Sequence, residues 1–404
     1  MLSAEIWRPW CGFLDHRRDV LSAFRILHSA FRMTVRLLIA GGGTGGHLYP
    51  GIAVARELLA RVPGSTVTFV GTAAGIESRV VPREGFELEV IRSAGLKGKS
   101  LQAIARGAAL LPLSAIDAWQ VLSRRRPSVV IGVGGYSSGP VVALAALRRI
   151  PTLLMEQNAM PGLTNRWLAG LVNAAAVTYE ESVSFFGGRA FVAGNPVRAE
   201  FFTAPAAAEA VAGLREGYDE HGQPPGAARV LVFGGSQGAH AINVAMVEAA
   251  SRLAAATPRL AITHQTGERD LEMVRDGYRH AGLQARVEPF LFAMDREMKA
   301  ADVVVCRAGA TTLAELMAAG RPSVLVPLPT ATDDHQRKNA EALVRHGAAR
   351  MVEQKELTGE RLARELLALA ADAATRAAMS ARARSLARPE AARLIVDRVL
   401  ELAA

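Results

Sequence analysis

The strongest constraint on the fold is a motif that occurs twice: an apolar strand, a glycine-rich turn and an alanine-rich helical pattern. It reads RLLIAGGGTGGH at residues 36–47 and RVLVFGGSQGA at residues 229–239. Other apolar runs alternate with helix-length segments, which is typical of parallel βαβ units. The sequence therefore predicts an α/β chain with two Rossmann-like, doubly wound parallel-sheet domains. Because ligands of such sheets bind beyond the carboxyl ends of the strands, we expect both turns to face one interdomain cleft.

Each half has its own series of predicted strands. In the first half we expect strands at 35–40, 66–70, 128–132, 152–155 and 175–178, and a helix at 50–61. In the second half we expect strands at 229–233, 260–265, 285–287, 302–306 and 323–326, and a helix at 239–254. We place the first domain at 33–197, the second at 198–387 and a C-terminal helix at 388–404.

Residues 1–32 differ from the rest of the chain. They contain two of the four tryptophans and no strand-like run, and Met33 stands just before the first predicted strand. We expect that translation begins at Met33. The alternative is a basic amphipathic helix, because apolar residues recur there at near-helical spacing among arginines.

The formal net charge of +9 favours an anionic partner, which means nucleic acid, a phospholipid surface or a phosphorylated substrate. The chain has no helix-turn-helix signature, zinc-ligand spacing or RNP-like aromatic run, so we expect no nucleic acid partner. No apolar run reaches the roughly 18–20 residues that span a bilayer. Two cysteines provide no disulfide framework, which favours a reducing cytoplasm.

The first turn, residues 41–46, matches the dinucleotide pattern G-x-G-x-x-G. That class of site also needs an acidic residue at the end of the second strand, about 20 residues on, to bind a ribose. No Asp or Glu occurs there before Glu77, which argues against a nicotinamide or flavin site. Backbone N–H groups at a helix start still suit a phosphate-rich ligand. The alternative is that each turn only lets strand and helix pack closely.

His47 directly follows the first turn, at the carboxyl end of a predicted strand, where catalytic groups gather in these folds. An imidazole accepts a proton near neutral pH, so we interpret His47 as a general base rather than as a structural residue. The chain has no Asp-x-Asp metal motif, and we expect no metal site or required cofactor.

Several segments, taken together, resemble the MurG family of membrane-associated N-acetylglucosaminyltransferases. They are GGGTGGHLYPGIAVA, GVGGYSSGP, EQNAMPGLTNRWLA, GNPVR, FGGSQGA and RAGATTLAELMAAGRPSVLVPLPTATDDHQRKNA, and the resemblance runs from about Met33 to the C-terminus. It implies the GT-B fold and inverting transfer of N-acetylglucosamine from UDP-N-acetylglucosamine. The acceptor would be the 4-hydroxyl of lipid I (undecaprenyl-pyrophosphoryl-MurNAc-pentapeptide), and the β-1,4-linked product would be lipid II for peptidoglycan and cell wall synthesis. The alternatives are another GT-B UDP-sugar enzyme (a soluble glycosyltransferase or a 2-epimerase) and a basic, non-enzymatic membrane scaffold.

The resemblance also implies roles for individual residues of the second half and the cleft. His47 is the implied base, with Glu156 or a water molecule as alternatives. Ser236 and Arg198 would contact the donor diphosphate, Leu291 the uracil, Glu315 the ribose, and Asn158 and Gln336 the sugar hydroxyls. The other implied donor-binding residues are Thr44, Gly45, Gly46, Ala310, Thr311, Thr312, Leu313 and Ala314. The residues just before Gln336 depart from the family pattern.

The first half would bind the lipid acceptor and the membrane. Gly134, Gly135 and Tyr136 are the implied acceptor-binding residues. Basic and apolar residues alternate in one amphipathic stretch, a signature of the membrane interface; the patch comprises Lys97, Lys99, Leu101, Ile104, Leu111 and Trp119. The alternative is an ordinary domain helix. We expect a peripheral protein on the cytoplasmic face of the bacterial inner membrane, with anionic phospholipid and possible cell-wall and division proteins as partners.

Overall fold

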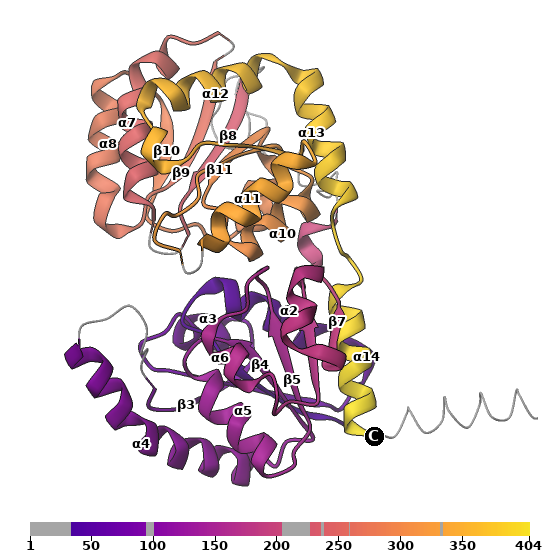
Figure 1. Ribbon diagram of the computed structural model, residues 1–404. Coiled ribbons are helices and arrows are strands. Elements are labelled where there is room, and N and C mark those ends of the chain that lie inside the picture. Colours follow the sequence, from indigo (N-terminus) through magenta and orange to yellow (C-terminus); the bar gives the residue numbers. More distant parts are fainter. Residues whose placement is uncertain (1–33, 94–100, 204–226, 236–237, 258, 332–333) are drawn as a thin grey trace, which may run out of the picture.

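The computed structural model describes residues 34–93, 101–203, 227–235, 238–257, 259–331 and 334–404, with the side chains of 101–109 left aside (Figure 1). The expectations for residues 1–32, Lys97, Lys99 and Ser236 lie outside these ranges. Leu101 and Ile104 fall in a helix whose first side chains are not described.

The first domain is built on a parallel sheet in the order β3-β2-β1-β4-β5-β6-β7. Its strands are β1 (Arg36–Gly41), β2 (Thr66–Gly71), β3 (Glu87–Val90), β4 (Val129–Gly134), β5 (Thr152–Glu156), β6 (Ala174–Val177) and β7 (Ala190–Val192). The central strands β1, β4 and β5 are buried along nearly their whole length and mostly apolar, because helices cover both faces of the sheet. The strand order reverses direction between β1 and β4, which is where such sheets bind ligands.

The second domain repeats this plan with a parallel sheet in the order β10-β9-β8-β11-β12-β13. Its strands are β8 (Ala228–Phe233), β9 (Leu260–Gln265), β10 (Ala285–Glu288), β11 (Val303–Cys306), β12 (Ser323–Leu325) and β13 (Ala349–Met351). Here the order reverses between β8 and β11.

The helices of the first domain are α2 (Gly45–Arg61), α3 (Glu77–Arg83), α4 (Leu101–Arg125), α5 (Ser138–Leu147) and α6 (Leu163–Leu168). Those of the second are α7 (His240–Ala254), α8 (Leu271–His280), α9 (Met294–Ala300), α10 (Ala310–Ala319), α11 (His335–Arg345), α12 (Gly359–Ala371) and α13 (Ala373–Ser385). The last helix, α14 (Ala391–Ala403), runs along the first domain (Figure 1). Its Ile395, Val396 and Val399 belong to the core of that domain, and Asp397 pairs with Arg61 of α2 at 2.6 Å.

The predicted fold class is confirmed: the chain has two parallel-sheet α/β domains with a pocket between them. Every predicted strand is present, with small shifts at the ends. The sequence reasoning missed β3, β7 and β13, which lie at sheet edges, are only three or four residues long and are partly exposed, so their local signal is weak. It was also wrong about the start of α2, which begins at Gly45 rather than at Pro50 and so includes His47 in its first turn.

Candidate active site

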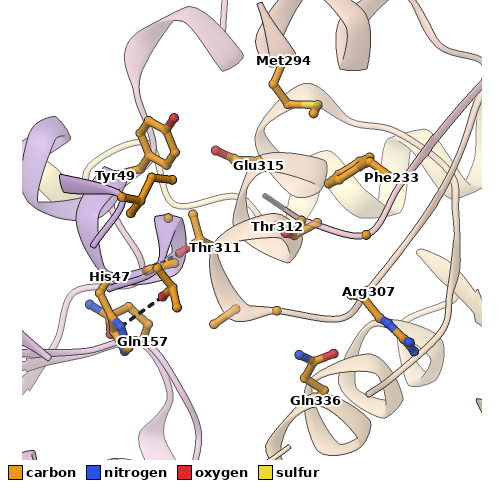
Figure 2. Close-up of a pocket in the computed structure, with 18 of the residues that line it drawn as sticks. His47, Tyr49, Gln157, Phe233, Met294, Arg307, Thr311, Thr312, Glu315 and Gln336 are labelled. Atoms are coloured by element: carbon orange, nitrogen blue, oxygen red, sulfur yellow. Dashed lines mark hydrogen bonds between the residues drawn. The ribbon is translucent and has the colours of Figure 1, made fainter. Parts of the chain in front are cut away.

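A pocket of about 600 Å³ lies between the domains, beyond the carboxyl ends of β1, β8 and β11. In Figure 2, His47, Tyr49 and Gln157 form one wall, and Glu315, Thr312, Arg307 and Gln336 come from the facing domain. Most of the predicted catalytic and donor-binding residues line it: Thr44, Gly45, Gly46, His47, Asn158, Arg198, Leu291, Ala310, Thr311, Thr312, Glu315 and Gln336. The tertiary structure therefore gathers segments from across the chain into one site.

His47 lies in the first turn of α2. Its Nδ1 is 3.2 Å from the hydroxyl of Thr44, which fixes one side of the ring. The other side packs so closely on Gly134 that a Cβ there would come within 2.9 Å of the ring. Burial lowers the pKa of His47, and the nearby Glu156 carboxylate opposes that shift. The imidazole is therefore neutral near pH 7, the state that a general base requires.

Glu156, the alternative proton acceptor, is fully engaged by hydrogen bonds. Its carboxylate accepts from the backbone and side-chain nitrogens of Asn158 at 3.0 and 3.3 Å, from the Gly162 N–H at 3.0 Å and from Asn165 Nδ2 at 2.8 Å. Only 3% of the residue is exposed. Glu156 thus orders the loop that brings Asn158 to the pocket, and its geometry favours His47 as the base.

The two domains meet directly beside His47. The hydroxyl of Thr311, in the first turn of α10, donates to the Gly46 carbonyl at 2.7 Å and accepts from Asn195 Nδ2 at 3.2 Å. The Gly46 carbonyl is available because the residue four positions on is Pro50, which has no N–H to donate. This hydrogen bond connects the starts of α2 and α10, so His47 has a fixed position relative to the second domain.

Arg198 lines the pocket. Its guanidinium lies 4.6 Å from the ring centroid of Tyr49 and 5.2 Å from that of Phe201, a cation–π arrangement. Glu84 is 3.9 Å away, and the buried Nε has no hydrogen-bond partner among the described residues. Arg198 therefore retains N–H groups that can donate hydrogen bonds to an anionic ligand.

Glu315 faces the pocket from α10 and is only 8% exposed. Burial raises its pKa to about 7, and Arg198 opposes the shift. Gln336 uses its side-chain carbonyl to accept from the Leu328 N–H at 3.0 Å, which leaves the amide NH₂ for a ligand. The N–H of Leu291 already donates to Gln265 Oε1 at 2.8 Å. The Leu291 carbonyl is therefore the backbone group that is left to contact a nucleobase such as uracil.

Some predicted residues are not brought to the pocket. Leu313 and Ala314 do not line the pocket: both are buried, and the Leu313 N–H bonds to the Gly309 carbonyl. The predicted contacts of these two residues with the sugar nucleotide stay a prediction. The predicted acceptor-binding residues Gly134, Gly135 and Tyr136 do not line the pocket either. Gly134 packs against the His47 ring, and a Cβ at Gly135 would come within 2.6 Å of the Gly42 carbonyl. Tyr136 is half exposed.

Sequence reasoning missed several pocket residues. Tyr49 lies two residues beyond His47 on α2, Gln265 is the last residue of β9, and Arg307 directly follows β11. The rule that ligands bind beyond the carboxyl ends of strands would have found the last two. Arg307 donates to the carbonyls of Val326 and Pro327 and to Gln354, so it holds the segment that leads to Gln336.

The first turn also differs from an open phosphate cradle, because the carboxylate of Glu77 fills it. Glu77 begins α3, yet it accepts a hydrogen bond from the Gly43 N–H at 2.7 Å. The tertiary structure therefore does place an acidic residue near the end of β2, as the dinucleotide pattern requires. The Glu77 carboxylate, however, points into the glycine turn rather than toward a ligand.

An apolar surface lies on α4, at the edge of the first domain away from α10 (Figure 1). Leu111, Ile116 and Trp119 are each about half exposed, and Arg148 lies over the Trp119 ring at 4.6 Å. In the part of the chain that the structure describes, no helix is long and apolar enough to cross a membrane. Within that same part, no cluster of His, Cys, Asp or Glu has the arrangement of a metal site.

Comparisons with known proteins identify both halves. The glycosyltransferase family 28 N-terminal domain matches residues 37–177, and the glycosyltransferase family 28 C-terminal domain matches residues 229–395. A curated relative from Anaeromyxobacter sp. (strain K) is 48% identical over 373 residues, which cover 91% of this chain and 93% of that relative. One from Geobacter sulfurreducens is 46% identical over 367 residues, covering 91% of this chain and 98% of the relative. Both are named UDP-N-acetylglucosamine–N-acetylmuramyl-(pentapeptide) pyrophosphoryl-undecaprenol N-acetylglucosamine transferase.

Solved structures agree with this assignment. The crystal structure of Acinetobacter baumannii MurG matches with a TM-score of 0.67 and 28% identity, covering 91% of this chain and 99% of that one. A putative UDP-N-acetylglucosamine 2-epimerase from Listeria monocytogenes has a TM-score of 0.61 but only 13% identity over 91% of this chain and 96% of its own, so that likeness concerns the fold alone. The chain therefore belongs to the MurG family of glycosyltransferases, within glycosyltransferase family 28.

Proposed function

We propose that this protein transfers N-acetylglucosamine from UDP-N-acetylglucosamine to the 4-hydroxyl of the muramyl sugar of lipid I, with inversion, to give the β-1,4-linked lipid II. The single observation that carries the proposal is the pocket between the domains, where His47 faces the start of α10. The curated relatives of this chain are named for this transfer.

In the proposed reaction, His47 removes the proton from the attacking hydroxyl. A sugar hydroxyl is a poor nucleophile, so a positioned base contributes about 10²–10⁴-fold to the rate. When Nδ1 carries the imidazole proton and donates it to Thr44, Nε2 is the free base. Glu156 takes no part in proton transfer, because its carboxylate is saturated with hydrogen bonds.

The leaving UDP requires positive potential at its diphosphate. We propose that Arg198, Ser236 and the helix start after the second glycine turn provide it, since backbone N–H groups and a helix dipole stabilise an anion. Gly235 supports this role, because no atom of the described part of the chain lies within 4 Å of where its Cβ would stand.

The remaining donor contacts follow from the chemistry of each side chain. The Glu315 carboxylate would accept hydrogen bonds from the ribose hydroxyls, and the Gln336 amide and Asn158 would bind hydroxyls of the sugar. The Leu291 carbonyl is the proposed partner of the uracil N–H.

We also propose a peripheral location on the cytoplasmic face of the inner membrane. A lipid-linked acceptor must be met at a membrane surface, and exposed apolar side chains on α4 next to arginines suit that surface. In the domain division that we propose, residues 33–197 bind acceptor and membrane, 198–387 bind UDP-N-acetylglucosamine, and 388–404 return to the first domain.

The test is transfer of radiolabelled N-acetylglucosamine by the purified protein, with lipid I and a soluble aglycone as alternative acceptors. We expect labelled lipid II with lipid I and no product with the aglycone. Product on the aglycone alone would indicate a soluble glycosyltransferase. Conversion of the donor without any acceptor would indicate an epimerase, and vesicle binding without turnover would indicate a scaffold.

A further inference from the structure

The Glu77 carboxylate occupies the first glycine turn. Its Oε2 accepts from the Gly43 N–H at 2.7 Å, and its Oε1 accepts from the Thr72 N–H at 2.8 Å and the Thr72 hydroxyl at 3.0 Å. The residue is 1% exposed. No arginine or lysine pairs with Glu77 among the described ion pairs, so backbone N–H groups carry most of its stabilisation.

The glycines around this carboxylate leave it just enough room. A Cβ at Gly42 would come within 2.6 Å of the Glu77 carboxyl group, and one at Gly75 within 2.2 Å. A Cβ at Gly71 would come within 2.3 Å of the Glu77 side chain. The turn is therefore shaped around an anion, as a phosphate-binding turn is, but the anion belongs to the protein.

The second glycine turn differs at the equivalent place. A Cβ at Gly235 would meet no atom of the described residues within 4 Å, whereas Gly42 faces the Glu77 carboxyl group. Among the described residues, two glycine-rich turns thus differ: an internal carboxylate lies beside Gly42 in the first domain, and the position beside Gly235 in the second is open.

The occupied turn is connected to the base. The Gly42 N–H donates to the Gly134 carbonyl at 3.3 Å, and Gly134 packs on the His47 ring. Gly43 directly precedes Thr44, whose hydroxyl lies 3.2 Å from His47 Nδ1. We infer that the Glu77 carboxylate takes the place of a ligand phosphate in the first glycine turn, and that it positions His47 by holding the start of α2.

A neutral side chain of the same size cannot satisfy this arrangement. Two N–H groups, those of Gly43 and Thr72, point at different oxygens of the carboxylate. Glutamine has one acceptor oxygen and one NH₂ group, so one of these N–H groups would face another donor. An unpaired buried donor is costly, and the turn would shift to relieve it.

The inference rests on the proposed role of His47, and its first test is the kinetics of Glu77→Gln with lipid I. We expect kcat to fall about 10- to 100-fold, because a displaced base loses alignment, while KM for UDP-N-acetylglucosamine changes little. The matched control is Glu57→Gln on α2, the helix of His47; among the described ion pairs Glu57 has only a surface pair with Arg61, and the variant should keep wild-type kcat.

The second test is chemical rescue. Glu77→Ala leaves the Gly43 and Thr72 N–H groups facing an empty space of carboxylate size. Formate or acetate should refill this space and raise the kcat of Glu77→Ala at least about tenfold, whereas neutral acetamide should not. Rescue specific to an anion would not arise if Glu77 only filled volume.

The outcomes separate the possible failures. Wild-type kcat in Glu77→Gln, or equal rescue by acetate and acetamide, overturns the inference and leaves the proposed transfer intact. Loss of UDP-N-acetylglucosamine binding by the Glu77 variants in calorimetry would show a folding role only and also overturn it. Absence of lipid II synthesis by the unmodified protein would instead refute the proposed function.

Discussion

At the scale of single residues, burial favours the neutral form of two titratable groups that line the pocket, His47 and Glu315. Loss of hydration lowers the pKa of His47 and raises that of Glu315 to about 7. Both shifts favour the neutral form. A neutral imidazole suits a base, whereas a carboxyl group with a pKa near neutrality makes donor recognition sensitive to pH.

His47→Ala should lower kcat by at least about 100-fold, because the attacking hydroxyl loses its proton acceptor. Donor KM should stay within about twofold, since His47 acts in the transition state rather than in ground-state binding. Steady-state transfer to lipid I measures both, with the exposed His346→Ala as control. Turnover near the wild-type rate would refute the base assignment.

Glu315 gives a pH-dependent prediction for donor binding. If the ribose hydroxyls donate to its carboxylate, UDP-N-acetylglucosamine binds the ionised form. Its affinity should then rise with pH up to about 7 and fall by as much as about tenfold per unit below that. Calorimetry from acid to neutral pH, in a His47→Ala background, measures this dependence.

In Glu315→Gln, affinity should be weaker and independent of Glu315 ionisation, and Glu315→Ala should raise donor KM strongly. An unchanged KM would remove the ribose role.

The pH dependence of folding stability has the opposite sign to that of donor binding. Because the pKa of Glu315 is raised in the folded state, its contribution to stability is lost as pH rises from 4.5 toward about 7.

At the scale of elements, α4 combines a buried face with an exposed one. Ala118, Val121 and Leu122 pack in the domain core, while Leu111 and Trp119 are exposed. An ordinary domain helix would be polar on its outer side, so the exposed face favours a membrane contact.

Replacing Leu111 and Trp119 with Ser should weaken flotation with anionic vesicles by at least about tenfold, since each buried apolar side chain is worth about 1.5–3 kcal/mol. Turnover of a water-soluble acceptor analogue should remain. Met273→Ser, an exposed position on α8, is the control. Charge reversal at Lys97 and Lys99 should act in the same direction, and unaltered flotation in both variants would place the membrane surface elsewhere.

At the scale of the whole molecule, the last helix couples the end of the chain to its beginning. Ile395 and Val399 are fully buried in the first-domain core, although the chain reaches α14 only after the second domain. The first domain is therefore completed last during synthesis. Thr311 adds a hydrogen bond from the second domain to Gly46.

Ile395→Ala should lower the free energy of unfolding of the first domain by about 2–5 kcal/mol, because it opens a cavity in that core. Urea denaturation followed by a first-domain tryptophan should show an earlier midpoint, while UDP-N-acetylglucosamine binding to the second domain persists in low urea. Leu402→Ala, on the same helix but only partly buried, is the control. Equal midpoints for the two variants would contradict the packing argument.

The amino-acid sequence by itself determined the central strands, both glycine turns and the position of His47 after the first of them. These are local signals: a strand covered on both faces needs an unbroken apolar run, and a tight turn needs glycine. The edge strands β3, β7 and β13 are short and partly exposed, so their local signal is weak.

Only the tertiary structure decided what those turns hold and which groups meet in the pocket. Glu77 fills the first turn from 34 residues away, and Thr311 reaches Gly46 from 265 residues away. The pKa of Glu315 depends on burial between two domains. Such contacts leave no periodic trace in the sequence, because they arise from packing of whole elements rather than from neighbouring residues.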